Sequence, residues 1–157
     1  MDPMSQPVAI NPRIIEALYC EALILADEAR TAFEKAMRPV TDRDDEDLVR
    51  IALSCEALRT TTRMMHALAW LLNYRAYFNG ELTEFQLLRQ ARLTQNYPGA
   101  DAERLALLDA GTRELVGATE RFYARLVRIE KGWRQGGAKA PTAISRLEER
   151  LGISAAG

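Results

Sequence analysis

The chain holds few of the residues that usually carry catalysis. His66 is its single histidine, and Cys20 and Cys55 are its two cysteines. A histidine within a helix can accept a phosphoryl group, but the apolar run from Ala67 to Trp70 follows His66, so we interpret it as a partly buried structural residue. The cysteines lack the CxxC spacing typical of zinc sites, and we expect both to be small core side chains. The sequence therefore predicts no catalytic residue, no cofactor-binding residue, no metal ligand and no enzymatic activity.

Composition indicates one soluble domain. Of the 157 residues, 48% are hydrophobic and 27% are charged, as in globular proteins. The formal net charge of −1 gives no general electrostatic attraction for nucleic acids or anionic membranes. The N-terminal residues do not resemble a signal peptide, and no apolar stretch reaches the roughly 20 residues of a membrane span. We therefore expect a cytoplasmic protein that neither binds nucleic acid nor inserts into a membrane.

Apolar residues recur at helical spacing in three long segments. The predicted inward face of the first segment is Ile15, Leu18, Ala22, Leu25, Ala29, Ala32 and Ala36. That of the third is Leu105, Leu108, Thr112, Leu115, Thr119, Phe122, Leu126, Ile129 and Trp133. In the first segment, Asn11 and Pro12 are typical of a helix start. Pro39 should end this helix near residue 37. The second helix is expected over residues 48–79, with Gly80 as the residue that follows its end.

A short helix and a third long helix complete the predicted fold. Thr83 and Gln86 have the spacing of a capping box, and Asp101 is expected to cap a helix that continues to Trp133. The fold class is all-α: an elongated antiparallel three-helix bundle, with a short extra helix in the second connection and a short C-terminal tail. The expected domains are an N-terminal arm (1–10), the bundle (11–134), and a linker with a flexible or short-helical tail (135–157).

An up-down-up order would bring the turn after the first helix close to the end of the third helix. This order predicts a charged pole, at which an acidic turn lies near basic residues of the third helix. Two interpretations of this pole remain open: local charge compensation, or a polar patch that docks a partner. The pole residues are Asp44, Asp45, Asp47, Arg125 and Arg128.

The second helix is apolar on two sides. Its regular stripe, expected to face the other long helices, is Leu48, Ile51, Cys55, Leu58, Thr62, Met65, Ala69, Leu72 and Ala76. A helix that is apolar all round must be covered on both sides. The second face is expected to contact either the following short helix or a second copy of the chain, and we expect a homodimer. This candidate dimer or partner surface comprises Met64, Trp70, Leu71, Tyr74, Tyr77 and Phe78.

A polar segment interrupts the middle of the second helix. It comprises Arg59, Thr60, Thr61, Thr62 and Arg63. Three consecutive threonines are unfavourable inside a helix. One interpretation is a polar layer that fixes the register between helices, and the other is a specific contact with a ligand or partner.

The same helix carries a resemblance to a known family. Residues 58–65, 69–72 and 75–76, which read LRTTTRMM, AWLL and RA, resemble the signature helix of the alphaproteobacterial RcdA family, the regulators of CtrA degradation. The order of elements is also similar over roughly residues 10 to 133. This resemblance implies a dimeric three-helix bundle without enzymatic activity.

The resemblance further implies an adaptor in cell-cycle-regulated proteolysis. Such adaptors help deliver cell-cycle regulators to the ClpXP protease. The implied partners are ClpXP, CpdR-like and PopA-like adaptors and the cargo regulators, and the implied location is the cytoplasm, including the cell pole. The alternative is a structural or regulatory helical dimerisation protein that binds a signalling or transcription factor and not a protease.

Overall fold

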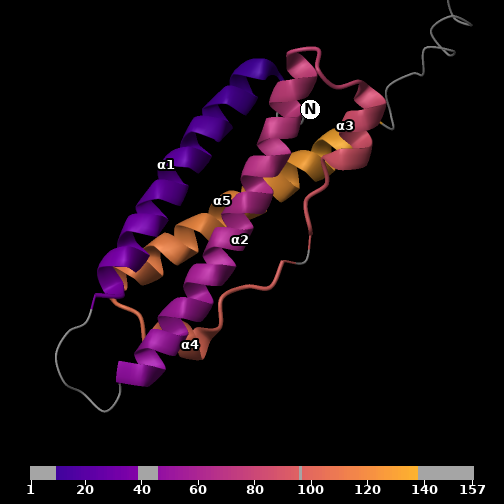
Figure 1. The fold of residues 1–157 in the computed structure, drawn as a ribbon. Helices are drawn as coiled ribbons and strands as arrows, with labels where there is room; N and C mark the ends of the chain where they lie inside the picture. The colour runs from indigo at the N-terminus through magenta and orange to yellow at the C-terminus, as the bar shows by residue number, and fades with distance from the viewer. Residues whose placement is uncertain (1–9, 39–45, 96, 138–157) are drawn as a thin grey trace, which may run out of the picture.

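The computed structural model describes residues 10–38, 46–95 and 97–137, and all regular structure in these ranges is helical (Figure 1). Three long helices form the body, and two short helices lie between the second and third of them in the chain. The expected all-α bundle is confirmed, with one short helix more than predicted. The elements are α1 (Pro12–Ala36), α2 (Glu46–Phe78), α3 (Glu84–Gln90), α4 (Ala102–Ala106) and α5 (Ala110–Gly137).

Local sequence signals account for several helix ends. The Asn11 side chain accepts a hydrogen bond from the backbone N–H of Ile14 at 3.0 Å and so caps α1. Thr83 and Gln86 form the predicted capping box at the start of α3. Gly80 follows α2 with a φ of 78°, a left-handed conformation that glycine adopts without strain.

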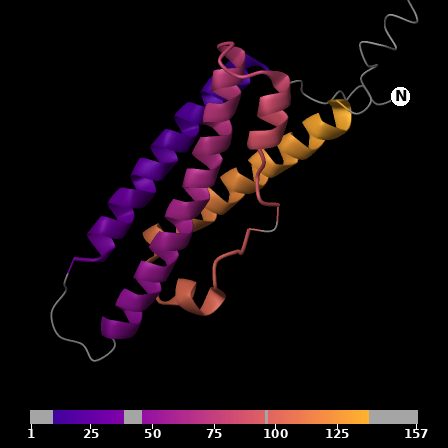
Figure 2. The same ribbon diagram turned by 45° about the vertical axis from the view of Figure 1, so that its right-hand side comes forward.

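The direction of α5 differs from the up-down-up expectation, because α5 runs parallel to α2. Arg63 of α2 contacts Thr119 of α5, and further along both helices Tyr74 packs edge-on against Trp133. α1 is antiparallel to both (Figures 1 and 2). The chain between α3 and α4 returns along the bundle (Figure 2), so α5 begins at the end of the bundle where α1 finishes.

The third long helix also begins later than expected. Asp101 caps α4, where it accepts from the N–H of Glu103 at 2.9 Å. Asp109 precedes α5 and accepts from the hydroxyl and the N–H of Thr112 at 2.6 and 3.0 Å, which holds the pKa of this carboxyl below its usual value. α5 then continues to Gly137, beyond the predicted bundle limit of residue 134. The arm before residue 10 and the tail after residue 137 lie outside the described residues.

The core confirms the predicted faces of α1 and α5 but not that of α2. On α1 and α5, residues such as Ile15, Ala22, Phe122 and Leu126 are buried as expected. On α2, the predicted inward stripe faces outward, and the opposite side is buried. Polar residues on this buried side made it resemble a solvent face in the sequence. The buried residues of α2 are Ala52, Leu53, Glu56, Thr60, Arg63, Met64, Ala67, Trp70, Leu71 and Tyr74.

Glu56 is an exception to the rule that buried polar groups are paired. The residue is fully buried, and neither of its carboxylate oxygens has a hydrogen-bond partner among the described residues. The hydroxyl of Thr60, one turn further along α2, is also buried without a partner in that part of the chain. An unpaired carboxylate in the interior lowers the stability of the fold.

Replacing Glu56 with methionine, a side chain of similar length, is therefore expected to stabilise the protein. We expect Glu56→Met to raise the free energy of unfolding in urea at pH 7 by about 1–3 kcal/mol, because it removes a polar group without making a cavity. Glu28→Met, at an exposed position of α1, is the control and should change stability by less than about 0.5 kcal/mol. A Glu56→Met protein less stable than wild type would show that the carboxylate has a partner.

Candidate interaction surface

The most distinctive surface feature is an uncovered apolar face on α2. We call it the α2 stripe, and its nine residues are those of the regular stripe predicted above, from Leu48 to Ala76. Its large members are strongly exposed: Leu48 by 60%, Ile51 by 59%, Leu58 by 70%, Met65 by 64% and Leu72 by 47%. The stripe is about 42 Å long at 1.5 Å per residue. In Figure 1 the side of α2 toward the viewer carries no other described helix.

The second apolar face of α2, which was the candidate dimer surface, lies mostly inside the chain. Met64, Trp70, Leu71 and Tyr74 are at most 3% exposed. They share one cluster with Leu87 of α3, Leu93 of the following segment, and Phe122, Tyr123 and Leu126 of α5. The assignment of these four residues to a dimer surface was wrong, because α3 and the chain after it cover them. Tyr77 and Phe78 are half-buried and pack against the same cluster.

The five residues from Arg59 to Arg63 point in different directions, because consecutive helical residues are about 100° apart. Thr60 and Arg63 face the core, Thr61 faces solvent, and Thr62 lies on the α2 stripe. The Thr62 hydroxyl donates to the carbonyl of Leu58 at 2.9 Å, so it is satisfied within the helix. Within the segment, Thr60 and Arg63 lie on the side that faces the core, so only part of it can form a polar layer between helices.

Arg63 makes the polar contact between α2 and α5 that the sequence suggested. Its side chain is 2% exposed, donates to the Thr119 hydroxyl at 2.9 Å, and forms a salt bridge with Glu120 at 3.4 Å. The guanidinium also lies 5.4 Å from the centre of the Tyr97 ring. Burial lowers the pKa of Arg63, and the charge of Glu120 opposes this effect. This contact fixes α2 against α5 and so orients the stripe outward.

Carboxylates of α5 hold the extended segment that precedes α4. Glu120 accepts from the backbone N–H of Ala100 at 2.6 Å, and buried Glu130 accepts from the N–H of Leu93 at 3.2 Å. From α2, Arg59 donates to the carbonyl of Gly99 at 2.9 Å. Sequence reasoning missed Glu120 and Glu130, since their partners are backbone groups of a segment without a periodic pattern.

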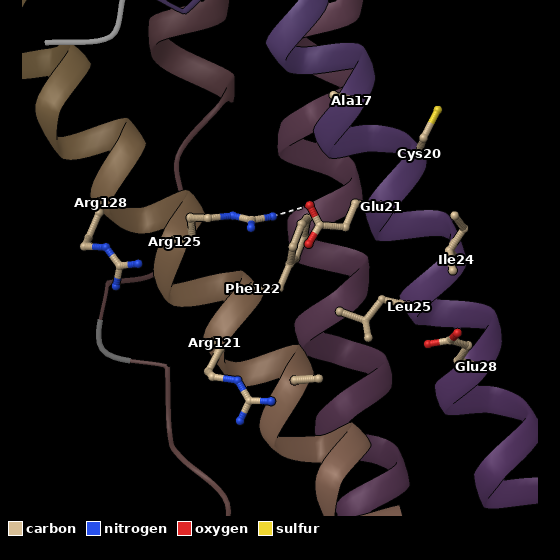
Figure 3. A pocket seen from close by; sticks show the side chains of 11 residues that line it. Ala17, Cys20, Glu21, Ile24, Leu25, Glu28, Arg121, Phe122, Arg125 and Arg128 are labelled. Carbon is tan, nitrogen blue, oxygen red and sulfur yellow. Dashed lines mark hydrogen bonds and ion pairs between the residues drawn. The ribbon is translucent and has the colours of Figure 1, made fainter.

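The three described residues of the predicted charged pole do not come together. Asp47 is exposed at the start of α2, whereas Arg125 lies on the later half of α5, which runs parallel to α2. Arg125 instead pairs with Glu21 of α1 across the groove in Figure 3, which Arg128 also lines. The direction of α5 explains the difference. Asp44 and Asp45 lie outside the described residues.

The residues first considered for chemistry are dispersed. His66 is exposed on α2 and packs its ring edge toward Tyr97, so its predicted partial burial is wrong. Cys20 is exposed on α1 and Cys55 is half-buried on the α2 stripe, so neither is a core residue. Within the described ranges no group of three or more His, Cys, Asp or Glu could hold a metal ion. No helix in these ranges is long and apolar enough to cross a membrane.

These features define a helical bundle with a long apolar face that is exposed among the described residues. Such a face is typical of proteins that bind other proteins. The model of a family described as proteins of unknown function, DUF1465, matches residues 7–154, and the chain belongs to this family. No curated protein and no solved structure matches the chain.

The burial of Tyr74 predicts a specific pH dependence of stability. Burial raises the pKa of Tyr74 well above its usual value near 10. As the pH rises above 10, the tyrosine ionises in the unfolded chain but not in the folded one, so the free energy of unfolding falls. At pH 11 this loss amounts to about 1.4 kcal/mol.

Tyr74→Phe should remove that part of the loss. The hydroxyl has no partner in the described residues, so the variant should match wild type in urea unfolding at pH 7. At pH 11 it should be the more stable of the two. Equal pH dependence in both proteins would place Tyr74 in contact with solvent and contradict its assignment to the core.

Proposed function

We propose that this chain is a non-enzymatic homodimeric adaptor that resembles the RcdA family and helps deliver cell-cycle regulators to the ClpXP protease. The observation that supports the proposal is the α2 stripe, an exposed apolar face that gives the chain a surface for self-association and so supports a dimeric adaptor. The resemblance of the helix around Arg59–Arg63 to the RcdA signature supports the assignment to proteolysis. The proposed partners are ClpXP, CpdR-like and PopA-like adaptors and cargo regulators, in the cytoplasm or at the cell pole.

The proposed mechanism is an increase in effective concentration. An adaptor that binds both cargo and protease converts their encounter into an intramolecular step. A dimer presents each weak binding surface twice, so the summed affinity exceeds that of either copy. The charged groups of α2 that flank the stripe near its middle and end, Arg59 and Arg75, are engaged within the chain, with Gly99 and Glu16 respectively.

The test combines affinity capture with a degradation assay. The tagged wild-type chain is expected to enrich the protease or a response-regulator-like adaptor from a lysate of the source cells, identified by mass spectrometry. Adding the purified chain to purified ClpXP, the CpdR-like adaptor and a fluorescent cargo regulator should accelerate loss of the cargo. Leu58→Glu on the stripe should weaken both effects, whereas Ile24→Glu, at a comparably exposed position of α1, should not.

Two results would contradict the proposal. One is capture of a transcription or signalling factor with no protease component, which would support the alternative of a regulatory dimerisation protein. The other is unchanged cargo turnover when all three purified components are present. Neither result depends on which face of the chain forms the dimer.

A further inference from the structure

We infer that the α2 stripe packs against the same stripe of a second copy, with the two α2 helices antiparallel and Thr62 of each opposite Met65 of the other. This inference rests on the proposed function in taking the adaptor to be a dimer, and it adds the face and the register. The face is opposite to the one predicted from the sequence.

The spacing of the stripe is that of a seam between two helices. Its nine positions follow steps of three and four without interruption from Leu48 to Ala76. Steps that average 3.5 residues keep one face toward a partner helix along its whole length. Six of these positions are exposed and Cys55, Thr62 and Ala76 are half-buried, so the described part of a single chain supplies no partner helix for the seam.

Side-chain size along the stripe selects the antiparallel orientation. One set of alternate positions is large, namely Ile51, Leu58, Met65 and Leu72. The other set begins with Leu48 and is otherwise small, namely Cys55, Thr62, Ala69 and Ala76. A parallel pair places large residues opposite large ones and small opposite small, whereas an antiparallel pair places each large residue opposite a small one. Alternation of large and small across facing positions fills the interface evenly.

One antiparallel register pairs all eight of these residues other than Leu48. It places Thr62 opposite Met65, Ala69 opposite Leu58, Cys55 opposite Leu72, and Ala76 opposite Ile51. Sliding one helix by seven residues in one direction would bring Leu48 against Leu72 and leave Ala76 beyond the start of the partner's α2. Sliding it in the other direction would leave Ile51 and Cys55 beyond the end of the partner's α2. The first register therefore avoids the crowded layer, and the stripe residue that it leaves unmatched is Leu48, opposite position 79 just beyond the end of α2.

The size and charge of the face are compatible with a stable dimer. A strip 42 Å long and one helix diameter wide has a projected area of roughly 400–500 Å² per chain. Its ridged surface and its flanks bring the contact toward the roughly 800 Å² per partner of a standard interface. Among the described side chains, the flanks carry one carboxylate, Asp47 at the start of α2, and their arginines, Arg59 and Arg75, are directed to Gly99 and Glu16 of their own chain. No strong like-charge repulsion therefore opposes the pairing.

The oligomeric state tests the face. Sedimentation equilibrium of the wild-type chain at micromolar concentration should give twice the chain mass. Leu58→Glu, which would place a charge in the seam, should weaken the dimer by roughly a hundredfold or more, while Ile24→Glu should leave it unchanged. Both positions are exposed in the monomer, by 70% and 61%, so both variants should keep the wild-type helical circular dichroism. A monomeric wild type, or equal effects of the two variants, would overturn the inference.

Disulfide formation tests the register through the native Cys55. In a Cys20→Ser background, Leu72→Cys should give a covalent dimer under mild oxidation, seen on a non-reducing gel, because residue 72 faces Cys55 of the partner. The background protein alone and Met65→Cys in that background should cross-link far less. Strong cross-linking of the background alone would indicate a parallel pair, and stronger cross-linking by Met65→Cys would indicate the register shifted by seven residues. Either outcome overturns the proposed register.

This test is separate from that of the adaptor role. A monomeric chain that still captures the protease would overturn the dimer seam and leave the binding role intact. A cross-linked dimer that captures no protease component and does not change cargo turnover would overturn the adaptor role and leave the dimer seam intact.

Discussion

The arrangement of this protein depends on one constraint. The α2 helix is apolar on opposite sides, and the other described elements cover only one of them. The side with Trp70, Leu71 and Tyr74 is covered within the chain by α3, α5 and the segment that joins α3 to α4. Once these elements are placed there, the stripe with Leu58 and Met65 is left to solvent. Such an exposed face is unfavourable in water unless something covers it. The proposed dimer follows from that surplus, and the proposed adaptor role uses the dimer to present its binding surfaces twice.

Buried polar contacts determine which side of α2 is covered. Arg63 fixes α2 against α5 through Thr119 and Glu120, and Glu130 fixes the returning segment through the backbone of Leu93. Groups of this kind contribute little net stability but specify orientation when they are satisfied. Rotating α2 so that the stripe faced inward would expose Trp70 and leave Glu120 without the arginine. The outward direction of the stripe is therefore built into the interior.

Much of the fold could be predicted from the sequence, because it is encoded locally. Asn11, Thr83 and Gly80 have the residue types that helix ends require, and the structure uses all three as predicted. The face of α2 could not be predicted, since Glu56, Thr60 and Arg63 made the core side look polar while the outer side had an unbroken apolar pattern. Periodicity detects an apolar face but does not identify its partner. The direction of α5 could not be predicted either, because it depends on the segment before α4. Side chains of α5 hold that segment through hydrogen bonds to the backbone of the segment.

Solvent contact along the stripe in the intact wild-type protein tests the account most directly. Ile51 on the stripe and Ile24 on α1 are exposed to nearly the same extent in the single chain, by 59% and 61%. Their methyl groups can be labelled with carbon-13 and observed by NMR at micromolar concentration, with a soluble paramagnetic compound added. If a second copy covers the stripe, the Ile51 methyl signal should be shielded while that of Ile24 is broadened. Equal broadening of both signals would show that the stripe stays open to solvent and would contradict the account.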